Sequence, residues 1–411
     1  MALRARRAAP GEGGVSAAAC PVCGSGEVEE FLRREAVPAH QNLLMESEDA
    51  ALAAPRGDLR LACCPRCGFV HNRAFDPGRL SYGAGYDNTQ TCSPSFRAHV
   101  EGLVRHLVEE RGVRGCHVVE VGCGQGDFLR RVVEAGGPGT TGTGFDPAYT
   151  GPERDLDGRV SFQRRFYGPG CAGVPADVVV CRHVIEHVPD PVGLLTAVRA
   201  ALRGSADARV FFETPTVEWI LRNRVVWDFF YEHCSYFTGR SLAAAFEAAG
   251  FAAREVRHVF GGQYLWLEAA PASAPAAAPG DGGEVLRLAR EFAAAEPEVR
   301  AAYHAQLAEW GGKGGVALWG AGAKGATLAD LIDPDRRLVA CVVDLNPQKQ
   351  GRYLPGTGHP IVDFRRLGAL GVKTAVLMNP NYRAENERLL REAGLDVALT
   401  ELTEPVHAGR G

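Results

Sequence analysis

Glu120-Val121-Gly122-Cys123-Gly124-Gln125-Gly126-Asp127 joins an apolar run typical of a buried strand, residues 117–121, to a run typical of an amphipathic helix. The glycines of this turn, Gly122, Gly124 and Gly126, let a bound molecule approach the backbone closely. Glu120 ends the strand, where its carboxylate can meet a cation such as the amino group of a methionine moiety. The next strand-like run ends at Asp146, 20 residues after Gly126, where a carboxylate that binds a ribose diol is expected.

The glycine spacing indicates which cofactor this turn binds. Dinucleotide-binding turns usually read G-x-G-x-x-G, whereas Asp127 follows G-x-G-x-G here. The turn resembles the cofactor site of class I S-adenosylmethionine-dependent methyltransferases. We therefore predict that Glu120, the three glycines and Asp146 bind S-adenosylmethionine. A nicotinamide cofactor and a purely structural loop are the alternatives.

Strand-like and helix-like runs alternate on both sides of this turn. Strands are predicted at residues 117–121, 141–145, 177–181 and 208–213, and helices around 95–111, 127–135 and 191–202. A Pro/Ala tract at residues 271–280 reads as a linker. After it, a helix over 283–310 precedes strands at 316–319, 338–343 and 374–378. This alternation predicts an α/β fold with parallel sheets.

Composition limits the classes of protein that this chain can belong to. The 411 residues carry a net charge of −4, with 46% hydrophobic and 23% charged residues, which is ordinary for a soluble protein. The chain has no excess of basic residues that would favour binding of nucleic acid. None of its apolar runs approaches the length needed to cross a bilayer. We expect a cytoplasmic enzyme, a monomer or homodimer, that needs neither nucleic acid nor membrane.

Two short cysteine motifs predict a metal site. Cys20-Pro21-Val22-Cys23-Gly24 and Cys64-Pro65-Arg66-Cys67-Gly68 share the spacing C-P-x-C-G. Four thiolates occupy all four coordination positions of a tetrahedral zinc ion, which makes the site structural rather than catalytic. The predicted ligands are Cys20, Cys23, Cys64 and Cys67. Cys63 is treated as a bystander, and two unrelated buried pairs or a redox motif are the alternatives.

A histidine-rich stretch follows the strand at residues 177–181. His183-Val184-Ile185-Glu186-His187 has the H-x-x-E-H spacing of some zinc proteases, but Pro189 and Pro191 interrupt the helix that such a site requires. Class I methyltransferases commonly have a similar stretch beside the cofactor, so the resemblance places His183 there. His187 is either a general base or part of the pocket wall, and the wall is favoured.

Aromatic residues surround a Glu-His pair in residues 227–238. Such a segment can shield a pocket from water while it holds an imidazole near neutral pKa, as proton abstraction requires. Glu232 can orient His233 or hold a substrate hydroxyl. Tyr231 and Tyr236 can donate to a substrate carbonyl or simply pack. An ordinary aromatic core segment is the alternative.

Nearly all of residues 20–405 resembles the sugar C-methyltransferases, which methylate C3 of nucleotide-linked 4-keto-deoxysugars for natural-product glycosides such as antibiotics. The resemblance is carried by the cysteine motifs, residues 120–127, the Y-E-H-x-S-Y-F-T segment at 231–238 and the G-A-G-A-K-G turn at 320–325. It implies that His233 is the base, with Glu232 beside it. It also implies that Tyr86 contacts the cofactor and substrate.

The resemblance also implies a domain organisation. We expect a disordered leader at residues 1–15, a zinc-ribbon-like domain at 16–77 and a class I methyltransferase core at 78–270. A linker at 271–283 and a C-terminal Rossmann-like α/β domain at 284–411, which binds the substrate, complete the chain.

Two segments depart from the pattern of the sugar enzymes. Those enzymes have Tyr-Asp-Glu-His where this chain has Phe230-Tyr231-Glu232-His233, and N-x-x-x-H-I where it has residues 183–187. The expected reaction is methylation of a carbon next to a ketone. Two other functions stay open: an O- or N-methyltransferase of another small scaffold, and a zinc-ribbon interaction protein without turnover.

A second glycine turn lies in the C-terminal part. Gly320-Ala321-Gly322-Ala323-Lys324-Gly325 follows a strand, and Asp344 ends the next one, 19 residues after Gly325. Taken alone, this pattern suits a second dinucleotide. The resemblance implies instead that the turn receives the nucleotide diphosphate of the substrate, for which Lys324 supplies a cation. A purely structural domain is the alternative.

Overall fold

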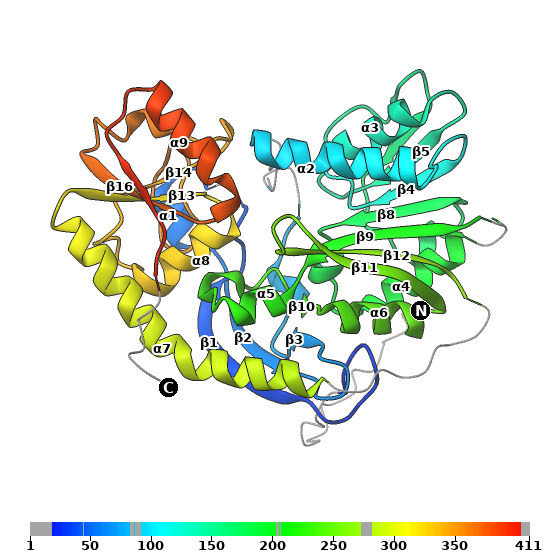
Figure 1. Cartoon of the computed structure of the whole chain (residues 1–411), viewed down its shortest axis with the longest axis horizontal. Helices are drawn as coiled ribbons and strands as arrows, with labels where there is room; N and C mark the ends of the chain where they lie inside the picture. The colour runs from blue at the N-terminus through cyan, green and yellow to red at the C-terminus, as the bar shows by residue number, and fades with distance from the viewer. Residues whose placement is uncertain are drawn as a thin grey trace, which may run out of the picture.

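A computed structural model describes residues 19–43, 45–82, 86, 92–202, 205, 207–272 and 282–403. The predicted leader and most of the predicted linker lie outside these residues. The described chain builds three β-sheets with helices packed around them (Figure 1). None of its helices is both long and apolar enough to cross a bilayer.

The first sheet is antiparallel and combines segments that are far apart in the sequence. Its order is β1 (Glu29–Pro38), β2 (Arg56–Cys63), β3 (Val70–Asn72) and β10 (Ser235–Tyr236). Ser235 pairs with His71, and Tyr236 pairs with Val70. This pairing fixes the segment that carries His233 against the N-terminal part of the chain.

The second sheet holds the first glycine turn. Its order is β11 (Phe251–Val259), β12 (Tyr264–Pro271), β9 (Arg209–Pro215), β8 (Val178–Arg182), β4 (His117–Val121), β5 (Thr141–Phe145), β7 (Val160–Gln163) and β6 (Arg154–Asp155). The five strands from β9 to β7 are parallel, and β12 enters antiparallel between β9 and β11. Parallel pairing brings the carboxyl ends of β4, β5 and β8 to one edge, where ligands bind in such sheets.

The third sheet is parallel throughout. Its order is β15 (Ile361–Val362), β14 (Cys341–Val343), β13 (Gly315–Trp319), β16 (Val372–Leu377) and β17 (Ala398–Thr400). The second glycine turn follows β13 and leads into α8. The predicted parallel α/β pattern is therefore confirmed in both halves of the chain.

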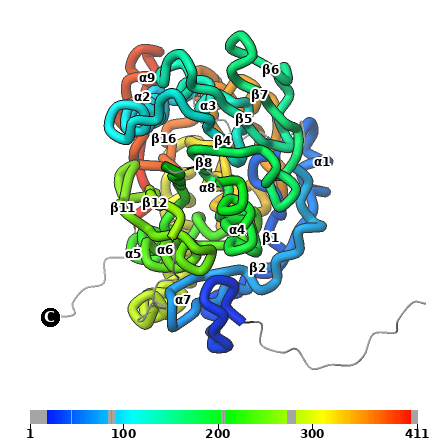
Figure 2. Tube along the Cα trace, turned by 90° about the vertical axis from the view of Figure 1, so that its right-hand side faces the viewer, coloured from blue at the N-terminus to red at the C-terminus, as the bar shows by residue number. Residues whose placement is uncertain are grey.

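The helices cover the faces of these sheets (Figures 1 and 2). They are α1 (Glu48–Leu52), α2 (Pro94–Arg105), α3 (Asp127–Gly136), α4 (Pro191–Ala201), α5 (Val217–Arg222), α6 (Gly239–Ala248), α7 (Gly283–Gly311), α8 (Ala323–Ile332) and α9 (Arg383–Glu392). Proline at the first helical position and a side-chain cap begin α2 and α4, as the sequence rules for helix starts expect.

The long helix α7 connects the first and third sheets through one shared core. It contacts β1, β2, α5 and α8 (Figure 1). Leu59 of β2, Phe292 of α7 and Leu318 of β13 belong to the same cluster of buried side chains. Because apolar side chains of β2, α7 and β13 are buried against one another, separating these elements would expose them to water. The shared core therefore favours one fixed arrangement of these elements. The predicted domain boundaries are therefore crossed by β10 and by this core.

Candidate active site

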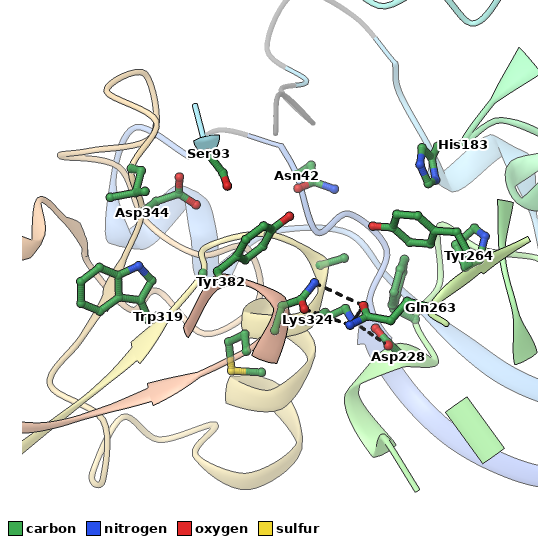
Figure 3. A pocket seen from close by; sticks show the side chains of 18 of the residues that line it. Asn42, Ser93, His183, Asp228, Gln263, Tyr264, Trp319, Lys324, Asp344 and Tyr382 are labelled. Carbon is green, nitrogen blue, oxygen red and sulfur yellow. Dashed lines mark hydrogen bonds and ion pairs between the residues drawn. The ribbon is translucent and has the colours of Figure 1, made fainter. Parts of the chain in front are cut away.

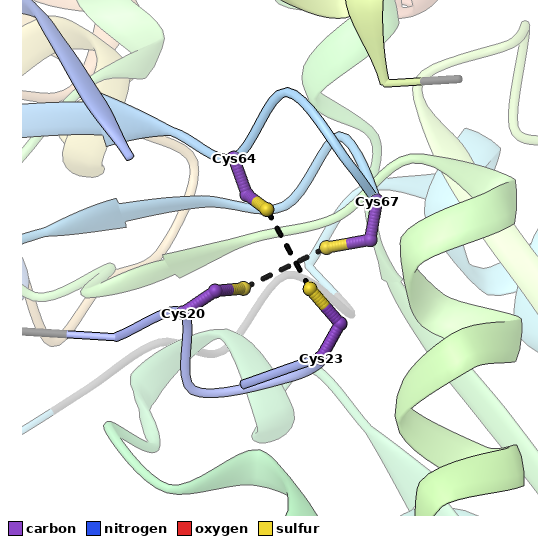
Figure 4. Close-up of side chains that lie close together, drawn as sticks. All are labelled: Cys20, Cys23, Cys64 and Cys67. Atoms are coloured by element: carbon purple, nitrogen blue, oxygen red, sulfur yellow. Dashed lines mark hydrogen bonds between the residues drawn. The ribbon is translucent and has the colours of Figure 1, made fainter. Parts of the chain in front are cut away.

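The four predicted metal ligands come together where the segment before β1 meets the turn between β2 and β3 (Figure 4). The Sγ atoms of Cys20 and Cys67 are 3.6 Å apart, as are those of Cys23 and Cys64, and all four sulfurs lie within 4.8 Å of one another. A tetrahedral zinc ion with bonds of about 2.3 Å holds its sulfurs about 3.8 Å apart. The donor set therefore fits zinc. The sulfur of Cys63 lies outside this group and contacts the backbone carbonyl of Cys64.

The two cysteine motifs have the same backbone geometry, which explains their shared glycines. Gly24 and Gly68 have φ values of +68° and +74°, where a Cβ atom is strained. The amide of each glycine donates to the carbonyl of the first cysteine in its motif, at 2.9 Å in both cases. Each motif thus forms one tight turn that aims two sulfurs at a common point.

The first glycine turn packs closely against its neighbours only because it lacks side chains. Gly122 has a φ of +70°, and a Cβ atom there would lie 2.1 Å from Cγ2 of Val184. A Cβ atom on Gly126 would lie 2.4 Å from the ring of Phe162. The turn then runs into α3, whose N-terminus presents backbone N–H groups to the edge of the sheet.

Glu120 has the properties of a ligand-binding carboxylate. It is 2% exposed, and its Oε2 atom has no hydrogen-bond partner. Burial raises its pKa to about 8, although Arg182 partly offsets this effect. An unpartnered buried carboxylate is costly unless a cation satisfies it, and the amino group of S-adenosylmethionine supplies one. The residues of this site therefore fit the predicted cofactor.

Replacing Glu120 by glutamine should stabilise the protein without cofactor, and the gain should grow with pH. The folded pKa is about 8 against an ordinary value of 4.5, so wild-type stability falls as pH rises through this window. Glutamine stays neutral throughout. Thermal melts at pH 5 and pH 8.5 should therefore show a melting-temperature advantage that is larger by a few degrees at the higher pH.

The same variant should bind S-adenosylmethionine more weakly. Glu134→Gln, on the exposed face of α3, is the matched control and should change neither property. A stability difference that does not vary with pH would contradict the account of Glu120.

Asp146 holds the glycine turn in the absence of a ligand. Its Oδ2 accepts a hydrogen bond from the amide of Gly124 at 2.9 Å, and its Oδ1 accepts one from Ala148 at 2.7 Å. Burial raises its pKa, against the effect of these two bonds. Each carboxylate oxygen accepts more than one hydrogen bond, so both remain able to bind a ribose diol.

A cavity opens between the second and third sheets (Figure 3). It encloses about 1380 Å³ of empty space, its open mouth included. The part of the chain that forms the second sheet contributes residues at or after the ends of β8, β9 and η5 (Val226–Asp228). Residues 282–403, which form the third sheet and are called the C-terminal half below, contribute the second glycine turn. Lining residues from both halves include His183, His187, His233, Tyr264, Trp319 and Asp344.

His233 stands in the cavity wall in a form that can accept a proton. Its ring packs on Phe230 and meets the ring of His187 edge to face, with centroids 4.1 and 4.7 Å away. Burial and the neighbouring His187, His183 and Lys324 hold its pKa well below 6.5. Within the described part of the chain no hydrogen bond occupies the ring nitrogens. A neutral imidazole with an available lone pair is the state that a general base requires. The near-neutral pKa expected from the aromatic segment is not found, because burial and the neighbouring histidines lower the pKa further.

Glu232 does not orient His233, which corrects the role predicted for it. The Glu232 carboxylate is fully buried and accepts hydrogen bonds from the amide of Gln41 at 2.8 Å and from the hydroxyl of Tyr86 at 2.9 Å. His40 Nδ1 lies 3.2 Å from it and carries the ring proton, because Nε2 accepts from the amide of Ser81. Glu232 therefore ties the His233 segment to the N-terminal part of the chain.

Tyr231 and Tyr236 are also corrected, because neither hydroxyl faces the cavity. The hydroxyl of Tyr231 accepts from the amide of Asp76 at 2.8 Å, and that of Tyr236 bonds both backbone groups of Phe230. Both side chains are almost fully buried and serve the packing of the first sheet. Catalytic and substrate-binding roles therefore do not fit these two positions.

Two further histidines complete this wall. Nδ1 of His187 lies 2.9 Å from the carbonyl of Glu232, an acceptor only, so Nδ1 carries the proton. His183 has a left-handed backbone, with φ of +53°, and lies 3.5 Å from Glu186 and 3.4 Å from Glu213. Burial alone would lower the pKa of His183, but these carboxylates raise it to about 9. Residues 185–187 form a short 3₁₀ turn, which rules out the protease-type helix.

The second glycine turn faces the cavity from the other side, and its lysine is already paired. Lys324 Nζ lies 2.9 Å from Oδ2 of Asp228 and donates to Oε1 of Gln263 at 3.1 Å (Figure 3). Asp344 accepts from the amides of Ala321 and Asn346 at 3.0 and 2.8 Å. Asp344 thus supports its turn as Asp146 supports the first.

Several cavity residues were not identified from the sequence. Gln263 lies in the turn between β11 and β12, and Tyr264 begins β12, a hairpin that no motif marks. Trp319 and Met378 read as ordinary strand ends. Tyr382 lines the cavity, whereas His359 is buried against Asp333 at 3.1 Å and does not. Gln263, Tyr264, Trp319 and Met378 lie at the carboxyl ends of parallel strands or beside those ends. This position is the signal by which they could have been found from the sequence.

Comparisons with known proteins agree with this arrangement. A family model described as a methyltransferase domain matches residues 96–256, and one described as a C-methyltransferase C-terminal domain matches residues 282–394. The chain is 30% identical to the C-methyltransferase NovU of Streptomyces niveus over 406 residues, which cover 91% of this chain and 93% of that protein.

Solved structures are similar over a smaller part. An O-methyltransferase family protein from Burkholderia thailandensis matches 43% of this chain and 56% of its own, with 19% identity and a TM-score of 0.35. Magnesium protoporphyrin IX methyltransferase from Synechocystis, with bound SAM, matches 46% and 86%, with 18% identity and a TM-score of 0.33. Neither similarity is high enough to say more about this chain.

Proposed function

The chain belongs to the S-adenosylmethionine-dependent C-methyltransferases, and from this premise we propose that it methylates a ring carbon next to the ketone of a nucleotide-linked 4-keto-deoxysugar. The predicted enzyme class and the class I methyltransferase fold are confirmed by the family models and the relative. The observation that carries the proposal is the cavity, because it joins a neutral His233 to the second glycine turn.

His233 performs the first chemical step of the proposed reaction. Its neutral imidazole takes a proton from the carbon beside the ketone, and the electrons of that bond make the carbon nucleophilic. S-adenosylmethionine supplies an electrophilic methyl group when it is bound. Glu120, Asp146 and the first glycine turn hold this cofactor, while the aromatic walls exclude water and so favour a reaction that neutralises charge.

The C-terminal half supplies the site for the nucleotide of the substrate. Trp319 and Tyr382 offer aromatic surface for a base, and Asp344 offers acceptors for ribose hydroxyls. Lys324 and Lys349 are the cations of this wall. Because Asp228 already pairs with Lys324, a diphosphate would share this lysine rather than meet a free charge.

Replacing Asp344 by asparagine should weaken the binding of thymidine diphosphate by roughly 10-fold or more, because a hydrogen bond to a charged acceptor is lost. Isothermal titration calorimetry measures this effect directly. Asp396→Asn, a fully exposed residue in the same half, is the control and should bind as the wild type does. Equal affinities of the two variants would contradict a nucleotide site at Asp344.

We assign a structural zinc ion to the cluster of Cys20, Cys23, Cys64 and Cys67. All four positions of a tetrahedral ion are then occupied by sulfur, so no position is left for catalysis. The ion would hold the turn before β3, and β3 pairs with β10 two residues after His233. Its proposed role is to hold β3 in place, and thereby β10 and the neighbouring His233.

Proton exchange in D2O tests the proposed reaction. In the presence of S-adenosylhomocysteine, the wild-type enzyme should replace the proton beside the ketone of a thymidine-diphosphate 4-keto-deoxysugar by deuterium. NMR of the recovered sugar measures this exchange. Methylation of an oxygen or nitrogen without exchange would favour the alternative O- or N-methyltransferase.

A further inference from the structure

The reaction proposed above needs a hydrogen-bond donor for the ketone oxygen. We propose that the phenol hydroxyl of Tyr264 donates this hydrogen bond and stabilises the enolate that forms when His233 takes the proton. The inference rests on the proposed function. The sequence predicted this role, donation to a substrate carbonyl, for Tyr231 and Tyr236. The inference makes Tyr264 a second catalytic residue of the cavity.

The surroundings of Tyr264 hold its ring and leave its hydroxyl available. The ring stacks on Phe260, with centroids 5.0 Å apart and planes 9° apart, and meets His183 edge to face at 4.6 Å. The residue is 8% exposed and lines the cavity, into which its hydroxyl points (Figure 3). In the described chain this hydroxyl has no hydrogen-bond partner. A rigid ring with an unused donor is preorganised for a ligand oxygen.

The other tyrosines near His233 have their hydroxyls engaged. Those of Tyr231 and Tyr236 bond backbone groups away from the cavity. Tyr82 lies 3.2 Å from Nδ1 of His187, and Tyr86 donates to Glu232. Tyr86, Tyr231 and Tyr236 cannot serve the ketone without giving up a bond that the fold uses. Tyr82 accepts from Nδ1 of His187 and is not among the residues that line the cavity.

The side chain that packs directly on the base offers no donor of its own. Phe230 lines the cavity against His233, and its ring carries no hydroxyl. Tyr264 places a phenol in the same cavity from β12, so it can supply the donor from another wall.

Tyr382 is the remaining phenol in the cavity, and its ring also contacts Phe260, but it follows β16 of the third sheet, on the side of the second glycine turn. It belongs to the C-terminal half, where Asp344 and Glu385 act on it electrostatically. Tyr264 instead belongs to β12 of the second sheet, which also holds the cofactor turn. Tyr382 acts on it electrostatically, as do Glu213 and Asp228. Burial raises the pKa of Tyr264 well above its usual value, so the phenol keeps its proton and remains a donor.

The step balances without any additional reactant. His233 takes the proton, the C–H electrons form a carbon–carbon double bond, and the carbonyl π electrons move onto the oxygen that Tyr264 holds. When the carbon attacks the methyl group, the ketone re-forms, and neutral S-adenosylhomocysteine leaves. His233 then releases its proton to solvent. The Tyr264 hydrogen bond is strongest while the oxygen carries charge, so it lowers the barrier rather than the energy of the bound ketone.

Tyr264→Phe tests the assignment, because it removes one hydroxyl and keeps the ring. Turnover of a thymidine-diphosphate 4-keto-deoxysugar should fall by about 100-fold or more, as for loss of an oxyanion donor elsewhere. Exchange of the substrate proton in D2O should fall by a similar factor, whereas S-adenosylmethionine affinity should change less than about twofold. Tyr353→Phe, away from the cavity, is the control and should match the wild type in all three.

The outcomes separate this inference from the proposed function. Wild-type exchange together with a Tyr264→Phe variant that keeps at least half of the turnover would overturn the role of Tyr264 alone. Reduced turnover with unchanged exchange would also overturn it, because the enolate would then form without this donor. A wild-type enzyme that methylates oxygen or nitrogen and never exchanges the proton would overturn both.

Discussion

His233→Asn is expected to lower the turnover number by a factor of about 100 to 10,000, the usual contribution of a positioned general base. Asparagine keeps a polar side chain of similar reach but cannot accept the proton. The first glycine turn follows β4 of the second sheet, whereas His233 precedes β10 of the first sheet, so S-adenosylmethionine should bind to the variant as it binds to the wild type. Stopped assays for the methylated product and calorimetry for the cofactor measure the two quantities.

The control for this variant is His258→Asn, an exposed histidine on β11, which should retain full activity. The pH profile gives a further check. Because the pKa of His233 lies well below 6.5, the wild-type rate should stay level from pH 8 to pH 6 and fall only in more acidic solution. Near-normal turnover of His233→Asn would show that His233 is not the base.

Removal of the metal is expected to have the largest effect on stability. Structural zinc contributes about 10–16 kcal/mol of apparent binding free energy in small zinc domains, and this binding is coupled to folding. Cys64→Ser should therefore lose about one equivalent of zinc and lower the melting temperature by roughly 10 °C or more. Elemental analysis and thermal melts provide the measurements.

Cys63→Ala is the matched control, because Cys63 is buried next to Cys64 but lies outside the four-sulfur group. It should keep its zinc, and its smaller destabilisation should reflect only the lost packing of a thiol. Equal zinc contents in Cys64→Ser and the wild type would contradict the assignment of this cluster.

The parts of the site that could be predicted from the sequence are encoded by local spacing. The glycines of residues 120–127 and the two C-P-x-C-G motifs each form a single turn, so their neighbours along the chain determine their geometry. The alternation of strands and helices predicted the parallel sheets for the same reason. Such features do not depend on how distant segments pack.

The parts that could not be predicted depend on contacts between distant segments. Glu232 bonds Gln41 and lies beside His40, more than 190 residues away, so its adjacency to His233 in the sequence was misleading. The hydroxyl of Tyr231 is taken up by Asp76, and Lys324 pairs with Asp228 across the cavity. Tyr231 lies in a turn and Tyr236 in β10, while His233 lies between them in neither, so a tyrosine close to the base in sequence need not face it.

The central claim is tested most directly by the position of the new methyl group. Purified enzyme, S-adenosylmethionine and a panel of thymidine-diphosphate 4-keto-deoxysugars should give a product in which NMR locates the methyl group on the ring carbon beside the ketone. A methyl group found on oxygen or nitrogen, or cofactor binding with no turnover of any sugar in the panel, would contradict the claim.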